Sequence, residues 1–134
     1  MDKSLLCLSY IRHMIQVDDG VKTYLPDINK IYSSVAPEGT TYPYVILTLD
    51  NIQTEYTKDR AFTNTITFTV TVYHNKYADC MYLSNYIRAA LENHKWKNST
   101  EEFYIDWISM QSATTGLTED FNYVTQMTFS TTMT

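Results

Sequence analysis

An alternation of residue types from Phe62 to Val72 constrains this sequence more than any other feature. One set of alternate positions is apolar apart from Asn64 and consists of Phe62, Ile66, Phe68, Val70 and Val72. The other set is threonine at positions 63, 65, 67, 69 and 71. Successive side chains of a strand point to opposite faces, so a period of two this long predicts a strand with one buried and one polar face. Threonine is β-branched and therefore favours extended structure on the polar face as well.

Two amphipathic helices are predicted on either side of this strand. Residues 3–17 place Leu5, Leu8, Ile11 and Ile15 on one face, and we expect Gly20 in Asp18-Asp19-Gly20 to cap the helix at its carboxyl end. A second helix is expected from a cap at Asn75 to about His94. Its core stripe consists of Cys80, Leu83, Ile87, Ala90 and Leu91, widened by Tyr82 and Tyr86.

The remaining segments predict short strands joined by turns. A short run spans residues 28–35, a turn follows at Ala36-Pro37-Glu38-Gly39, and Pro43 opens a strand from Tyr44 to Leu49. Two last strands are expected over residues 102–110 and 121–133, with a turn at Ala113-Thr114-Thr115-Gly116. Residues 1–134 therefore predict a single α+β domain, mainly an antiparallel sheet with two helices packed on one face.

Composition limits the possible ligands. The net charge is −5 and no large basic cluster occurs, which argues against duplex DNA as the primary ligand. Twelve tyrosines suit either half-buried strands or protein interfaces, and both interpretations stay open. Cys7 and Cys80 lie within apolar helical patterns, so we expect reduced, buried thiols. Nothing approaches the roughly 18 apolar residues of a membrane span.

Searching the sequence for catalytic or metal-binding patterns gives no candidate. His13, His74 and His94 lie in different predicted elements without metal-site spacing, and three glycines are too few for a phosphate-binding loop. Asp50 and Asp106 are expected on the wet faces of strands. We therefore predict no catalytic residue, no cofactor and no metal.

One loop stands out as a candidate contact surface. Two strands end and restart around the segment Glu55, Tyr56, Thr57, Lys58, Asp59 and Arg60, which is long, charged and aromatic for a hairpin tip. Loops held by a rigid scaffold often carry recognition, so we predict that this loop contacts another subunit or a partner. A solvated turn is the alternative.

Several short motifs resemble those of bacteriophage tail-completion proteins, also called head–tail joining or tail-terminator proteins. They are Ile31-Tyr32, Ala36-Pro37 and Pro43-Tyr44-Val45, followed by Val72-Tyr73 at the end of a strand, a helix with Tyr86-Ile87-Arg88-Ala89-Ala90-Leu91, and the acidic Glu119-Asp120 between two closing strands. The resemblance covers nearly the whole chain in order. The sequence is richer in tyrosine, threonine and asparagine than typical members, and poorer in glycine.

The resemblance implies a structural role without catalysis. It implies a virion protein of the tail or neck, assembled in the host cytoplasm into a ring, usually of six subunits, at the head-proximal end of the tail tube. The ring would cap the tube and join it to the head-connector or stopper protein, while DNA passes through the lumen without specific binding. Two alternatives remain. One is another neck component, such as a connector stopper or a twelve-subunit ring of a short-tailed phage; the other is a small-ligand-binding α+β domain.

Overall fold

The computed structural model describes residues 7–56, 62–92, 96–97, 104–105, 107–119 and 122–133. Three helices lie in this part of the chain: α1 (Cys7–Gln16), α2 (Asp19–Tyr24) and α3 (Tyr77–Leu91). The strands are β1 (Ile31–Ser33), β2 (Tyr44–Tyr56), β3 (Phe62–His74), β4 (Trp96–Lys97), β5 (Tyr104–Ile105), β6 (Ser109–Leu117) and β7 (Tyr123–Met133). The α+β class predicted from the sequence is confirmed.

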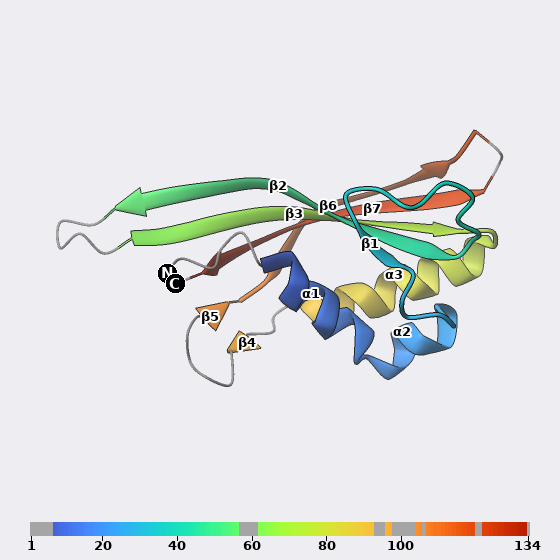
Figure 1. Cartoon of the computed structure of the whole chain (residues 1–134), viewed down its shortest axis with the longest axis horizontal. Coiled ribbons are helices and arrows are strands. Elements are labelled where there is room, and N and C mark those ends of the chain that lie inside the picture. The colour runs from blue at the N-terminus through green and yellow to red at the C-terminus, as the bar shows by residue number, and fades with distance from the viewer. Residues whose placement is uncertain are drawn as a thin grey trace.

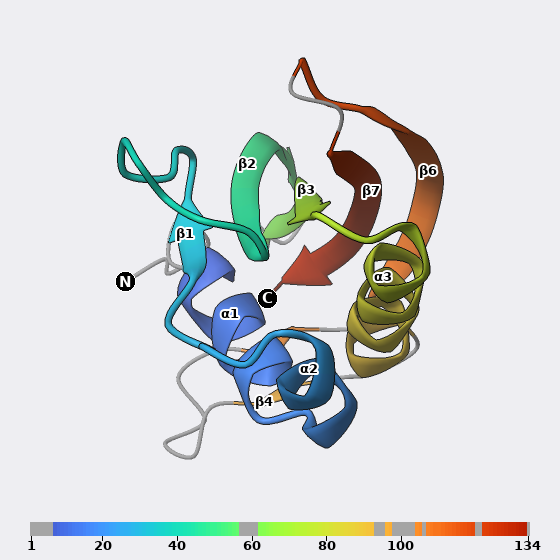
Figure 2. The ribbon, with the colours of Figure 1, turned by 90° about the vertical axis from the view of Figure 1, so that its right-hand side faces the viewer.

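The strands form one sheet in the order β1-β2-β3-β7-β5-β4, and β6 pairs with β7 on the same side as β5. All pairs are antiparallel except β1 with β2, which run parallel because residues 34–43 carry the chain back before β2 begins. The three helices cover one face of the sheet, as predicted for the helical layer (Figures 1 and 2).

The core lies between this face and the helices. The alternation in β3 is confirmed, because Ile66, Phe68, Val70 and Val72 are fully buried. Phe68 stacks on Phe129 of β7 with ring centroids 5.5 Å apart. From α1 come Cys7, Ile11 and Ile15, and from α3 come Cys80, Leu83, Ile87 and Leu91. Polar residues occupy the opposite face of β3, where Thr65, Thr67 and Thr69 are half-buried.

The first helix ends at Gln16, within one residue of the prediction, but the predicted cap at Gly20 is wrong. The Asp18 carboxylate accepts a hydrogen bond from the Val21 amide at 3.0 Å and caps a second helix, α2, which contains Gly20. Gly20 serves the packing of α2 on α3 instead, because a Cβ at this position would meet the ring of Tyr86. The prediction of two helices missed α2 because it has only six residues.

The predicted cap of α3 is also wrong. Lys76 holds the N-cap position without a side-chain hydrogen bond, and Asn75 precedes it. The Lys76 amide donates to Nδ1 of His74 at 3.2 Å, so the imidazole holds the chain at this junction. The helix ends at Leu91, three residues before the predicted limit, and His94 lies outside the described residues.

The largest error concerns the end of the chain. Ala113-Thr114-Thr115-Gly116 was predicted to be a turn, but these residues belong to β6 and pair with β7. The turn lies further on, where the Thr118 amide donates to the Asn122 carbonyl and the Asn122 amide to the Thr118 hydroxyl. The strand predicted over residues 102–110 is correspondingly split between β5 and the start of β6. Two adjacent threonines favour extended backbone, which outweighs the turn tendency of one glycine.

Candidate functional site

The hairpin of β2 and β3 forms an arm that projects beyond the helices (Figure 1). Its ladder continues to the pair Tyr56 and Phe62, and inside it the Thr54 hydroxyl donates to the Asn64 amide oxygen at 2.6 Å. Of the predicted contact loop, Glu55 and Tyr56 are exposed residues of β2, and 77% of the Tyr56 surface is accessible. Thr57, Lys58, Asp59 and Arg60 lie outside the described residues. The loop therefore stays a predicted contact surface.

One edge of the sheet is open along most of the arm. The short strand β1 pairs with β2 only from Val45 to Leu47. From Thr48 to Tyr56, no strand in the described part of the chain pairs with the outer side of β2. From Thr48 to Glu55, the outward backbone donors and acceptors of β2 thus have no strand partner in the described part of the chain.

The opposite edge is open as well. Among the described strands, β6 pairs only with β7, so no described strand covers its outer side from Ser109 to Leu117. At its start, the Glu92 carboxylate accepts a hydrogen bond from the Met110 backbone. Its sequence, SMQSATTGL, contains no charged residue and no proline. Charges and prolines are the common devices that keep edge strands of monomers from pairing with other chains. This edge lacks both devices, and its one irregularity lies between Met110 and Ser112. The regular part from Ser112 to Leu117 therefore favours a partner strand.

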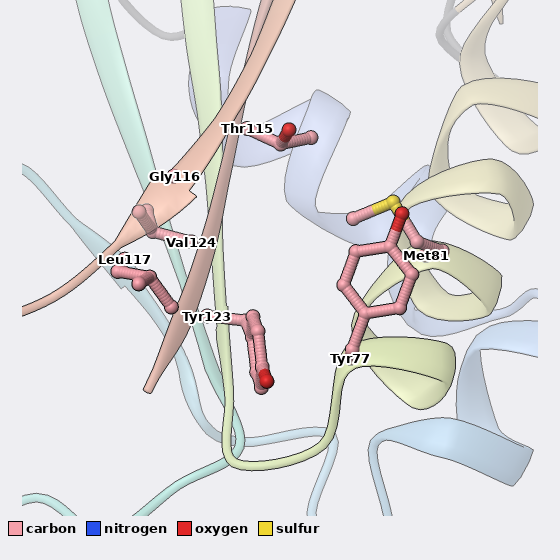
Figure 3. Close-up of a pocket in the computed structure, with 7 residues that line it drawn as sticks. All are labelled: Tyr77, Met81, Thr115, Gly116, Leu117, Tyr123 and Val124. Atoms are coloured by element: carbon pink, nitrogen blue, oxygen red, sulfur yellow. The ribbon is translucent and has the colours of Figure 1, made fainter. Parts of the chain in front are cut away.

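An apolar pocket of about 300 Å³ adjoins the β6 edge (Figure 3). Tyr77 and Met81 of α3 form one side, and Tyr123 lies across from Tyr77, with their rings edge to face at 5.5 Å. The other lining residues are Thr115, Gly116 and Leu117 of β6 and Val124 of β7. Tyr77 and Leu117 are 58% and 60% exposed. This lining suits aliphatic or aromatic side chains.

The sheet face opposite the helices is polar and almost uncharged. A shallow trough of about 400 Å³ crosses four strands on this face and is lined by Thr48, Asp50, Thr69, Thr71, Ser112, Thr114, Gln126 and Thr128. Asp50 is exposed, as predicted, and its carboxylate accepts a hydrogen bond from the Thr69 hydroxyl. Asp106 lies outside the described residues. The trough presents hydroxyl and amide groups, with one carboxylate already engaged.

Comparison with known proteins now decides the family. Residues 9–133 match the sequence profile described as tail completion protein gp17. The chain belongs to the tail completion protein family. It is therefore a structural phage tail protein, located in the virion, and the resemblance inferred from the short motifs is confirmed. No curated protein matches the sequence.

A solved structure shares the fold of this tail completion protein. It is a chain of the virion of a native gene transfer agent particle, with a TM-score of 0.77 and 13% sequence identity. The match covers 92% of this chain and 90% of the other. At this identity the match establishes the fold alone.

Seven of the twelve tyrosines of the tail completion protein gather in two clusters, apart from the pair at the pocket. On the polar face, Tyr44 stacks on Tyr73 with centroids 4.7 Å apart, and Tyr42 and Tyr32 contact Tyr44. On the helical layer, Tyr24 lies between Tyr82 and Tyr86 at 5.4 and 5.7 Å. Offset ring pairs contribute beyond their buried area, so some of the tyrosines act within the subunit.

Both cysteines are free and fully buried, in agreement with the predicted role of small hydrophobes. Burial raises the pKa of the Cys7 thiol to about 12 and raises that of Cys80 as well. The described residues contain no group of three His, Cys, Asp or Glu side chains placed to hold a metal. Of the three described helices, none is long and apolar enough to cross a membrane.

The sequence predicted the hairpin of β2 and β3 but ended its first strand at Leu49, seven residues too early. It missed the β6 edge and its pocket. Because residues 113–116 were predicted to form a turn, neither a long edge strand nor a pocket beside it was expected. The available signal was the uninterrupted extended propensity of Thr114 and Thr115, together with the absence of Asn, Asp or Pro from the assumed turn. The pocket itself depends on the approach of α3 to β7, which no local pattern reveals.

Proposed function

We propose that this tail completion protein is the subunit of a closed ring at the head-proximal end of the tail, which caps the tail tube and joins it to the head connector. Membership of the family supports a role in completing tails. The observation that carries the ring is the presence of two different open edges on opposite sides of one sheet.

Contacts between unlike surfaces of identical subunits generate rings when the rotation closes. A subunit with two unlike adhesive edges has the required polarity, because each edge of one copy meets the other edge of the next. Six copies form the proposed ring, in keeping with the family resemblance. A twelve-subunit ring would instead indicate the alternative, another component of the neck.

The ring works by shape and edge complementarity and needs no catalysis. The tail tube protein binds one side of the ring, and the head-connector or stopper protein binds the other. DNA passes through the lumen without specific binding, which a subunit of net charge −5 favours, since it repels phosphate. The arm, including Glu55, Tyr56, Thr57, Lys58, Asp59 and Arg60, is proposed to contact a neighbouring subunit or the tube.

Mass photometry across a dilution series, with and without purified tail tube protein, tests this function. The expected particle has six times the 15.6 kDa subunit mass, about 94 kDa, and it forms alone or when the tube is added. Electron microscopy of tubes assembled with the protein should show defined lengths capped at one end. A protein that stays monomeric and leaves tube length unchanged would refute the proposal.

A further inference from the structure

We infer that successive copies in the ring join their sheets, with β6 of one copy adding antiparallel to the open part of β2 in the next. In this arrangement Leu49 and Ile52 of the second copy are seated against the pocket of the first. The inference rests on the proposed ring and assigns its subunit interface. Such strand addition draws affinity from backbone hydrogen bonds and specificity from a side-chain pocket.

Charge favours this pairing over pairing of like edges. The open part of β2 carries Asp50 and Glu55, whereas β6 carries no charge. Two β2 edges brought together would place these carboxylates near one another, and like charges on facing strands are destabilising. The strand β6 itself imposes no such repulsion, and the Glu92 carboxylate beside Met110 is already paired with Arg88 at 2.6 Å. A β2 edge therefore pairs better with β6 than with a second β2.

The relative direction of the two strands follows from the sheet. β2 is antiparallel to β3, β3 to β7, and β7 to β6, so β6 runs opposite to β2 within one copy. A rotation about the ring axis preserves the direction of each strand along that axis. β6 of one copy therefore meets β2 of the next in the antiparallel sense.

The two edges also match face by face. Toward the helical side, β2 directs Leu49 and Ile52, which pair with the buried Phe68 and Ile66, and then Thr54 and Tyr56. β6 directs Leu117 to the same side, next to Tyr123 of the pocket. Each strand contains one register shift, between Leu49 and Asn51 in β2 and between Met110 and Ser112 in β6.

In the inferred register, residues that point to the same side of the sheet stay opposite one another on both sides of each register shift. Leu117 of one copy then faces Leu49 of the next, and Met110 faces Tyr56. On the helical side the exposed Leu117 and Tyr56 thus gain apolar neighbours. Ile52 falls opposite Thr115, so Leu49 and Ile52 both enter the pocket beside Tyr77. On the solvent side the facing residues are polar.

The stagger that this register needs agrees with a closed barrel of tilted strands. Within one copy Met110 is level with Leu49, through Phe129 and Phe68. In the inferred register Met110 faces Tyr56 of the next copy instead. The next copy is therefore displaced along the strands by about six residue pairs, or about 20 Å at ~3.3 Å per residue. Each copy adds four strands to the joined sheet, and four strand spacings of ~4.8 Å span about 19 Å. When the strands tilt by about 45° from the ring axis, that width corresponds to an equal displacement along the strands.

Engineered cysteine pairs test the register directly, since the natural thiols are buried. In the proposed register Thr114 faces Gln53 of the next copy, both exposed on the solvent side, so Thr114→Cys with Gln53→Cys should oxidise into a covalent ladder up to the full ring. The matched control is Ser112→Cys with Thr48→Cys. That pair is level within one copy and should not cross-link between copies in this register.

The outcomes separate the interface from the ring. If mass photometry shows rings but the cysteine pair at positions 114 and 53 forms no covalent oligomers, the inferred interface is wrong and the proposed ring is still supported. A complete ladder from the control pair, or dimers from Thr114→Cys alone as the main product, also overturn it. If no ring forms under any condition with the unmodified protein, the proposed function itself fails.

A second variant keeps the test valid if the cysteine variants fold poorly. Leu117→Asn changes an exposed side chain beside the pocket and should raise the concentration for half-assembly by about tenfold or more. The control is Val35→Asn, which changes a 73% exposed side chain in the loop after β1 and should leave that concentration nearly unchanged. Equal effects of the two substitutions would contradict the inferred interface.

Discussion

Gly20 of α2 lies so close to Tyr86 of α3 that a Cβ at position 20 would stand 2.3 Å from Cδ1 of the ring. Gly20→Ala therefore forces Tyr86 out of its stack on Tyr24 or separates the two helices. We expect a loss of about 1–3 kcal/mol of unfolding free energy in urea, typical of overpacking, although alanine has the higher helix propensity.

A double-mutant cycle isolates the cause of that loss. In a Tyr86→Ala background the ring is absent, so Gly20→Ala should become neutral or stabilise by up to about 1 kcal/mol. An equal loss in both backgrounds would show that the backbone at position 20, rather than Tyr86, requires glycine.

The two faces of β3 predict opposite sensitivities to truncation. Phe68 is fully buried against Phe129, so Phe68→Ala should cost about 3–5 kcal/mol through lost contacts and a cavity. Thr67 faces the polar side and is half-buried, so Thr67→Ala should cost less than about 1 kcal/mol. Urea melts measure both, and comparable losses would contradict the assignment of the two faces.

Shortening the tip of the arm should separate folding from assembly. Replacing residues 56–60 by an Asn-Gly turn leaves the core untouched and adds no loop-closure cost. Circular dichroism melts should stay close to those of the parent, while ring formation weakens, because Tyr56 is removed from the edge of β2. A variant in which only Lys58, Asp59 and Arg60 become serine keeps Tyr56 and reports on the loop charges alone. Normal rings and normal tail lengths from the shortened variant would leave the loop a solvated turn.

His74 should make stability depend on pH. Burial lowers the pKa of its imidazole below the ordinary value of 6.5, an effect that the nearby Lys76 reinforces and that Asp79 and hydrogen bonds to Tyr24 and Asn75 oppose. The unfolded chain then binds the proton more readily than the folded one, so unfolding free energy is retained above about pH 6.5 and falls as the pH drops below it. Denaturant melts from pH 8 to 5 should show this slope, and His74→Gln should reduce it. An unchanged slope in that variant would assign the dependence to other groups.

The central part of the fold could be predicted because its signals are local. The alternation from Ile66 to Val72 reports directly which face of β3 is buried, and the spacing of Cys80, Leu83, Ile87 and Leu91 reports the buried stripe of α3. In each element the spacing of the apolar residues equals the period at which side chains return to the same face. The buried face can therefore be predicted from the element's own sequence, without the rest of the chain.

The errors arose where distant contacts decide the structure. Gly20 has the features of a helix end, yet its role is to admit Tyr86, which lies far along the chain. Gly116 was read as part of a turn, but pairing with Val124 keeps it in β6. For the same reason the candidate site was only half predicted. The arm is a hairpin of adjacent strands, whereas the pocket combines residues from α3, β6 and β7.

The register shifts in β2 and β6 have a consequence for the assembly as a whole. An extra residue in an edge strand increases its twist, and the twist at the two edges sets the angle at which one subunit meets the next under the inferred pairing. Asp50 and Gln111 are the residues at these two shifts. Under the inferred pairing, deleting either one is expected to alter that angle, and with it the number of subunits in the circle and the width of the passage for DNA.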